Sequence, residues 1–141
     1  MKNLLTILLF FLFSNAGCTN KQDELLQRLG DTFKLKTSES ANFNDNGNTI
    51  FAKLVSIQES RCPKDVQCIR AGEAIIVLDL KIGEEQFNGL KVCIGCEKQM
   101  AITESIEINA KTRTYKLQLS SVDPYPQSTG LNTSTATLIL N

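Results

Sequence analysis

The sequence predicts an all-β domain of two packed antiparallel sheets, with a small closed β-barrel as the alternative architecture. Three observations lead to this fold class. The chain has 141 residues, the size of one ordinary domain, and 42% of them are hydrophobic, which is enough for one core. From Thr32 onward, short stretches of alternating apolar and polar residues are separated by turn signals. This alternation is typical of strands that bury one face.

The first well-marked strand follows a tight turn. Residues 44–48 read Asn-Asp-Asn-Gly-Asn, and these residue types tolerate the positive φ of a turn. In the next stretch, residues 49–57, alternate apolar residues share one face as far as Leu54. The phase then slips, because the next apolar residue of that face is Ile57. The same slip occurs at residues 119–122, so we predict a β-bulge at both positions.

The strongest strand signal covers residues 74–82, where apolar residues alternate over the whole stretch. Ile75 and Val77 make its opposite face apolar as well, so we expect this strand at the centre of a sheet. A turn at residues 83–85 leads into a further strand at 86–92. Three later strands are marked by Ile102, Ile106 and Ile108, by Tyr115, Leu117 and Leu119, and by Ala136, Leu138 and Leu140. About seven short strands at hairpin spacing predict an immunoglobulin-like β-sandwich.

Composition narrows the classes of function. Lys and Arg number 15, Asp and Glu number 15, and the formal net charge is zero. A nucleic-acid partner would call for a basic excess, so none is expected. The chain has no His, which excludes Ser-His-Asp and Cys-His catalysis and His-ligated zinc. We therefore expect a protein that is not an enzyme and that needs no cofactor and no metal.

The first 17 residues are predicted to be a secretory signal. A short positive start, Met-Lys-Asn, precedes an apolar run at residues 4–13. As a helix this run would rise only about 15 Å, too little for a hydrocarbon core of roughly 30 Å. Ala16 and Gly17 then precede Cys18, and this small pair before a cysteine resembles the lipobox of bacterial lipoproteins. The sequence departs from that pattern at Asn15, where most lipoboxes carry an aliphatic residue.

The lipobox resemblance implies a diacylglyceryl thioether on Cys18, and two or three acyl chains make a stable membrane anchor. It implies a place in the bacterial cell envelope, in the outer membrane, with the domain on the periplasmic or the cell-surface face. Residues 18–30 are then a tether before the domain at 31–141, and the spacing of three leucines predicts a short helix at 20–29. Lys21 to Glu24 resemble the charged export signals of some bacterial lipoproteins, and a plain linker is the alternative.

Four cysteines remain once Cys18 is lipidated, namely Cys62, Cys68, Cys93 and Cys96. An even number in an exported domain predicts a disulfide framework. Three pairings exist, and we expect the two local ones, Cys62 with Cys68 and Cys93 with Cys96. Closing the first loop should contribute roughly 2.4 kcal/mol before strain. A four-thiolate zinc site and a thiol-redox site at Cys93 and Cys96 are the alternatives.

A longer motif lies at residues 59–74, which read Glu-Ser-Arg-Cys-Pro-Lys-Asp-Val-Gln-Cys-Ile-Arg-Ala-Gly-Glu-Ala. It resembles a family of small bacterial lipoproteins of unassigned function, whose pattern is Asp-Ser-Arg-Cys-Pro, a Cys, an aromatic residue, Ala-Gly and a hydrophobic strand. The later Pro-Tyr-Pro of that family matches residues 124–126, and the resemblance runs from about Phe33 to Leu140. The chain departs from the family pattern at two positions. It has Glu59 where the family usually has Asp, and Arg70 where the family usually has Trp. The resemblance implies an exported all-β domain and no reaction.

Within this motif we expect a rigid loop, because Pro63 fixes φ and a bridge between the first two cysteines would close it. Two interpretations of Arg61 stay open: a brace for the loop, paired with Asp65 or Glu73, or a side chain that binds a partner. Tyr125 carries the same two interpretations. The candidate binding loop comprises Arg61, Pro63, Asp65, Arg70, Glu73 and Tyr125.

The sequence thus favours a lipid-anchored, non-catalytic binding module. Its expected partners are the membrane, through the lipid on Cys18, and an unknown envelope protein or glycan. The alternative is an inhibitor of an envelope or host hydrolase. A redox or zinc-binding protein that uses Cys93 and Cys96 is the third hypothesis.

Overall fold

The computed structural model describes residues 26–97, 101–129 and 133–141. This part of the chain forms eight strands and contains no helix. The strands are β1 (Thr32–Lys36), β2 (Ser40–Asp45), β3 (Asn48–Glu59), β4 (Ala74–Ile82), β5 (Glu85–Ile94), β6 (Ser105–Asn109), β7 (Thr114–Asp123) and β8 (Thr135–Leu140). The predicted all-β class is therefore confirmed, with one strand more than expected.

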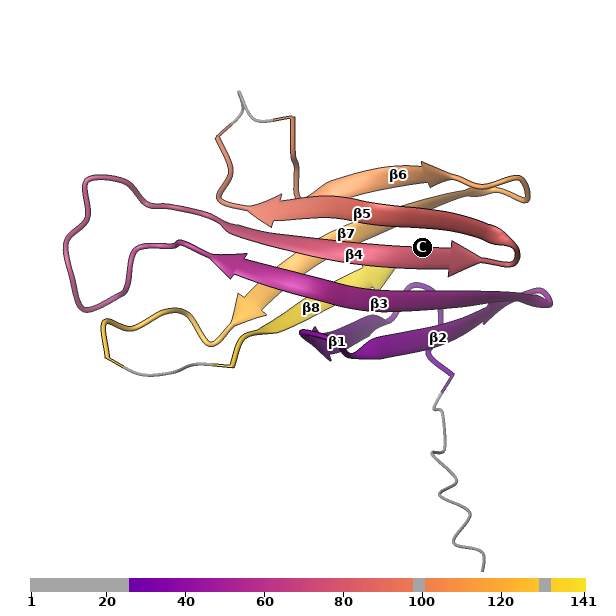
Figure 1. Ribbon diagram of the computed structural model, residues 1–141, viewed down its shortest axis with the longest axis horizontal. Coiled ribbons are helices and arrows are strands. Elements are labelled where there is room, and N and C mark those ends of the chain that lie inside the picture. The colour runs from indigo at the N-terminus through magenta and orange to yellow at the C-terminus, as the bar shows by residue number, and fades with distance from the viewer. Residues whose placement is uncertain (1–25, 98–100, 130–132) are drawn as a thin grey trace, which may run out of the picture.

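The strands form two antiparallel four-stranded sheets that pack face to face (Figure 1). One sheet has the order β2-β3-β4-β5 and the other β1-β8-β7-β6. The sheets stay separate layers and do not close into the alternative barrel. Most neighbours in a sheet are also consecutive in the chain, whereas immunoglobulin domains order their strands ABED and CFG. The domain therefore resembles the immunoglobulin fold in its two-layer architecture and differs from it in strand order.

Alternation along each strand places one set of apolar side chains between the sheets. In β4 the burial pattern alternates from Ala74 to Ile82, and in β8 from Ala136 to Leu140. The largest fully buried side chains are Tyr115, Phe43, Ile50, Leu54, Ile76, Leu78, Leu80, Leu117, Leu119, Leu138, Leu140 and Val92. They come from both sheets, so this core holds the two layers together.

Both predicted bulges are present. The pairing of β3 with β4 shifts between Leu54 and Ser56, and that of β7 with β8 shifts between Leu119 and Ser121. A third bulge, which the sequence analysis missed, lies in the pairing of β4 with β5. There Gly89 has a φ of 68°, and its N–H donates to Oδ1 of Asp79 at 2.8 Å. The Asn-Gly pair at residues 88–89 was the available signal.

One buried polar cluster also joins the sheets, at the turn end of β2. The hydroxyl of Tyr115 in β7 donates to Oδ2 of Asp45 in β2 at 2.9 Å, and Nη1 of Arg113 lies 3.4 Å from the same oxygen. Tyr115 is fully buried, so its hydroxyl needs this partner. Burial is the main cause that raises the pKa of Tyr115, and the Asp45 carboxylate raises it further.

The predicted helix at residues 20–29 is wrong where the structure describes it. From Leu26 the chain is extended or turning, and Gln27 forms a parallel bridge with Phe43 on the edge of β2. The N–H of Gln27 donates to the carbonyl of Asn42 at 2.8 Å. The edge of β2 offers this bond to the segment, and a helix this short is marginal alone.

The signal segment, Cys18 and Lys21 to Glu24 lie outside the described residues. Among the residues that are described, no helix is long and apolar enough to cross a membrane.

Replacing Tyr115 with Phe should lower the free energy of unfolding by about 2 kcal/mol, because it removes a buried hydrogen bond to a carboxylate.

Because the pKa of Tyr115 is raised on folding, the folded state favours the protonated phenol. The stability from that phenol is therefore complete below pH of about 10 and is lost as the pH rises further. Denaturant titrations at neutral pH and above pH of about 10 measure both effects. Tyr125→Phe at the exposed loops is the matched control, and an equal loss in both variants would contradict the prediction.

Candidate functional site

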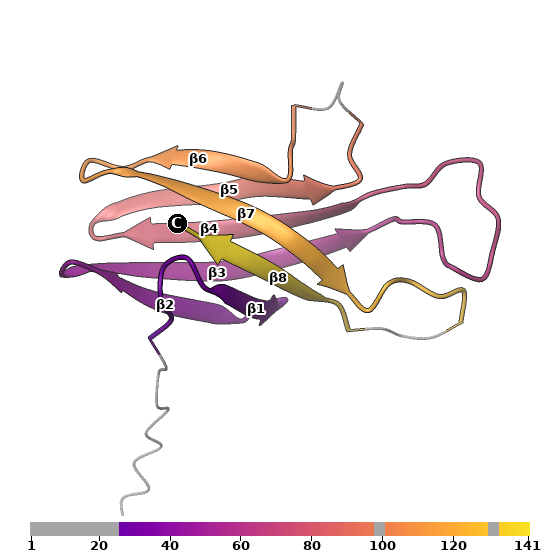
Figure 2. The same cartoon turned by 180° about the vertical axis from the view of Figure 1, so that it is seen from behind.

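Three long connections gather at one end of the sandwich. Strands β3, β5 and β7 end there, and their loops to β4, β6 and β8 cover residues 60–73, 95–104 and 124–134. We call this cluster the loop end. Figure 1 shows it on the left, with the 60–73 loop reaching furthest, and Figure 2 shows the same arrangement from behind. The loop end contains every residue of the predicted binding loop, including Tyr125, which is distant in sequence.

Two disulfides close the first two loops. Cys62 is bonded to Cys68 and Cys93 to Cys96, which are the predicted local pairings, each with Cα atoms 5.9 Å apart. The thiols of the alternative zinc site are therefore paired with one another. Backbone bonds continue β3 and β4 into the first loop, since the N–H of Ser60 donates to Glu73 and that of Cys62 to Ala71. The loop is thus tied at its base as well as by its disulfide.

Two glycines let the loops approach closely. Gly72 has a φ of 70°, and a Cβ built on it would lie 1.9 Å from the carbonyl oxygen of Ser60. No side chain fits there without moving backbone. A Cβ on Gly95 of the next loop would lie 3.0 Å from the carbonyl oxygen of Gly72. The second disulfide loop therefore packs directly on the base of the first.

Arg61 is the central contact of the loop end. Its Nε donates to Oε1 of Glu59 at 2.8 Å, and its Nη2 reaches Oε2 of the same carboxylate. Nη2 also donates to the carbonyl of Val122 in β7 at 2.8 Å, and the guanidinium lies 4.5 Å from the ring centre of Tyr125. The side chain is only 9% exposed. The hydrogen bond to Glu59 is the main cause that raises the pKa of Arg61.

The predicted partners of Arg61 were wrong. It pairs with Glu59 and not with Asp65 or Glu73. Residues two apart in an extended segment point to the same side, so Glu59 and Arg61 meet without any turn. The carbonyl of Glu73 instead accepts hydrogen bonds from the N–H and hydroxyl of Ser60.

The loop after β7 docks on the first loop through three further contacts. The N–H of Lys64 donates to the carbonyl of Pro126 at 3.2 Å, and its Nζ lies 5.2 Å from the ring centre of Tyr125. Tyr125 thus contacts both cations. The carboxylate of Asp65 accepts hydrogen bonds from the N–H and hydroxyl of Ser128, and these bonds lower its pKa. The cis peptide bond of this loop precedes Pro124.

A different set of side chains forms the outer surface of the first loop. Ile69 is fully exposed, Val66 is 45% exposed, and Arg70 makes only a long contact of 3.8 Å with Glu97, with both side chains mostly in water. The predicted site residues therefore separate into two groups. The first group forms the frame of the loop end and comprises Arg61, Pro63, Asp65, Glu73 through its carbonyl, and Tyr125. The second is Arg70 alone, which faces outward. The sequence analysis missed Ile69, although an aliphatic residue directly after the loop-closing Cys68 was a signal.

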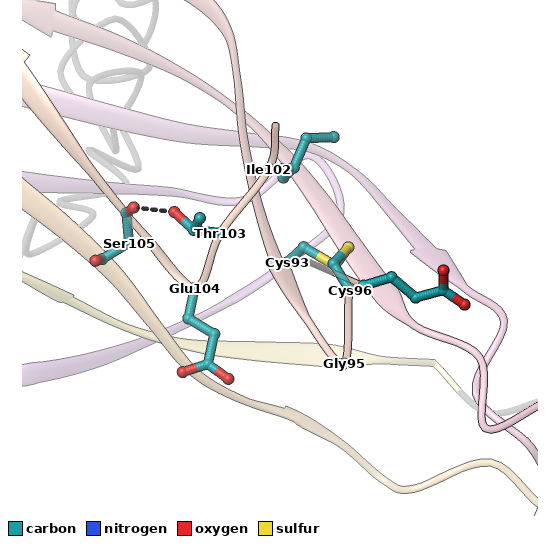
Figure 3. A pocket seen from close by; sticks show the side chains of 8 residues that line it. Cys93, Gly95, Cys96, Ile102, Thr103, Glu104 and Ser105 are labelled. Carbon is teal, nitrogen blue, oxygen red and sulfur yellow. Dashed lines mark hydrogen bonds between the residues drawn. A yellow bond between two sulfur atoms is a disulfide. The ribbon is translucent and has the colours of Figure 1, made fainter. Parts of the chain in front are cut away.

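A pocket of about 540 Å³ lies beside the second disulfide. Figure 3 shows the Cys93–Cys96 bond on its wall and the Glu104 carboxylate pointing away from that bond. The hydroxyl of Thr103 donates to the carbonyl of Ser105, as the dashed line marks. Cys93 is buried at the end of β5, and its N–H donates to the carbonyl of Thr103 at 2.9 Å, so the disulfide joins the end of this strand to the loop that follows it. Catalytic thiols usually lie at a helix start, and this surrounding does not supply one.

Comparisons with models of protein families, with curated proteins and with solved structures found no match for this chain.

The pair of Glu59 and Arg61 should be coupled by about 2 kcal/mol in a double-mutant cycle of Glu59→Gln and Arg61→Met, because both side chains are largely buried. Arg70 and Glu97 are the matched control, since the same two substitutions there should give a coupling below about 1 kcal/mol in water. Urea titration of each variant measures the coupling. Equal coupling energies in the two cycles would show that Arg61 does not brace the loop end.

Proposed function

We propose that the protein is a lipid-anchored envelope lipoprotein that acts as a non-catalytic binding module through its loop end. The observation that carries this proposal is the contrast within one loop. Arg61 is buried and fixed by Glu59 and Val122, while Ile69 on the same loop is fully exposed. A partner can bury such an exposed aliphatic side chain at a low cost in conformational entropy, because the loop that carries it is already ordered.

Rigidity is what makes such a surface useful for binding. A loop that is ordered in the free protein loses little conformational entropy when a partner docks. Here the disulfide at Cys62, the close fit of Gly72 and the contacts to the loop after β7 all restrict the first loop. Arg70 follows Ile69 directly in the chain and adds a positive charge that lies mostly in water. A protein surface with an apolar pocket and acidic neighbours fits these features.

The location of the loop end suits a protein that is anchored at its N-terminus. Near the start of the described chain, Gln27 forms a bridge with Phe43 of β2. Phe43 in turn lies opposite Ile50, near the start of β3. The loop end begins after Glu59, so β3 separates the two places by roughly 30 Å. A lipid on Cys18 would leave the loop end free to meet a partner in the envelope.

An inhibitor of an envelope or host hydrolase is the second candidate. The feature that favours it is the protruding, disulfide-closed loop, which is a suitable shape for an active-site cleft. A thiol-redox role for Cys93 and Cys96 has less support, because Cys93 is buried. We therefore place it third and expect no catalytic activity.

A photo-crosslinking amino acid at position 69, introduced in living cells, should trap one defined envelope protein. The control is the same amino acid at position 55, where Val55 is an exposed aliphatic residue on the outer face of β3, away from the loop end. Gel shifts and mass spectrometry of the adducts measure the outcome. The same adducts from both positions, or none from position 69, would contradict binding through the loop end.

Replacing Cys18 with Ser should abolish membrane attachment, because the thioether that holds the acyl chains is not formed. Fractionation of cells labelled with palmitate measures it, with Cys62→Ser as a control that keeps the label. Label on the Cys18→Ser protein would refute the lipid anchor.

A further inference from the structure

Phe51 is an aromatic side chain on the outer face of a sheet, away from the loop end. It lies in β3 between Asn42 of β2 and Lys81 of β4, and it is 37% exposed. Figure 1 views the molecule from the side of this sheet. The ring belongs to the face opposite the core, since its neighbours Ile50 and Ala52 are the buried ones. The hydrophobic core therefore does not account for an aromatic residue here.

Two shallow hollows flank this ring. The first has a volume of about 250 Å³ and is lined by Phe51, Lys53, Asp79, Lys81, Gln86 and Asn88. The second has a volume of about 340 Å³ and is lined by Phe51, Lys81, Asn48, Thr49 and Glu84. Phe51 and Lys81 belong to both hollows and form the ridge between them. The two hollows therefore adjoin, the first over β3, β4 and β5 and the second beside the turns that join β2 to β3 and β4 to β5, and we call them together the groove.

The third bulge, in the pairing of β4 with β5, lies at the first hollow, since Asp79 and Asn88 line that hollow. Next to Asn88, the N–H of Gly89 donates to Oδ1 of Asp79 at 2.8 Å. Bulges commonly redirect a side chain toward a site. Asp79 and Asn88 therefore line the hollow from a fixed backbone.

The chemistry of the groove selects a class of ligand. Amides, ammonium groups, carboxylates and a hydroxyl all line it, so both hydrogen-bond donors and acceptors surround one apolar ring. A purely apolar ligand would leave these polar groups unpaired where it covers them. The ammonium groups of Lys53 and Lys81 are balanced by the carboxylates of Asp79 and Glu84, so the lining has no net charge that would select an ion. A saccharide has an apolar C–H face for the ring and hydroxyl groups that both donate and accept.

From this groove we infer that the outer face of the β2-β3-β4-β5 sheet binds a saccharide, with one sugar unit on each side of the Phe51–Lys81 ridge. Phe51 supplies the stacking surface, and Lys53, Gln86 and Asn88 bind hydroxyl groups in the first hollow. This site goes beyond the proposed function, because it shares no residue with the loop end and does not depend on it.

Affinity electrophoresis of the purified full-length protein in detergent tests the inference, with laminarin, xyloglucan, galactomannan and dextran as probes. At least one of these neutral polysaccharides should retard the protein. Phe51→Ala should weaken that association about tenfold or more, while Phe51→Tyr should keep it. Val55→Ala, on the same strand but outside the groove, should bind like the unmodified protein.

Each outcome of this experiment either supports or overturns the saccharide site. Retardation by none of the four polysaccharides, or equal retardation of the Phe51→Ala protein, would overturn the inference. If Phe51→Ala does not fold, Asn88→Ala replaces it with the same expected loss. Ile69→Ser should bind saccharide normally, so failure of this site and failure of the loop end are distinguishable.

Discussion

The buried guanidinium of Arg61 is the interaction on which the loop end depends. A charge that is nearly excluded from water must be compensated, and here Glu59, the carbonyl of Val122 and the ring of Tyr125 do so together. These partners come from the end of β3, from β7 and from the loop after it. The Arg61 side chain therefore links the two sheets at this end, and the close approach of Gly72 and Gly95 adds the third loop.

The parts of this structure that local sequence determines were predictable, and the long-range contacts were not. Alternation located the strands, and its phase slips at Leu54 and Leu119 located two bulges, because period-two burial is a local property. The disulfide pairs followed from short separations. The partner of Asp65, by contrast, is Ser128, 63 residues away, and the carbonyl that Arg61 meets is 61 residues away. The leucine spacing before Gly30 predicted a helix, but from Leu26 onward the chain is extended or turning, and the N–H of Gln27 donates to the edge of β2 instead.

The sandwich presents two surfaces with different physical character. At the loop end, loops that are closed by disulfides carry exposed aliphatic and cationic side chains, and such a surface suits a protein partner. On the outer sheet face, a single aromatic ring lies among hydrogen-bonding groups in a shallow groove, which suits a saccharide. The two surfaces share no residue, so we expect substitutions on one surface to leave the other in place.

Amide hydrogen exchange of the native protein tests most directly whether the loop end is one rigid unit. The informative amides are those of Cys62, Lys64 and Ser128, which donate to Ala71, Pro126 and Asp65. The account predicts that all three are protected and that Arg61→Met raises their exchange rates together, while an inter-strand amide at the centre of β4 keeps its rate. Exchange of these amides at the rate of an unstructured chain, or an Arg61→Met protein with unchanged rates, would contradict it.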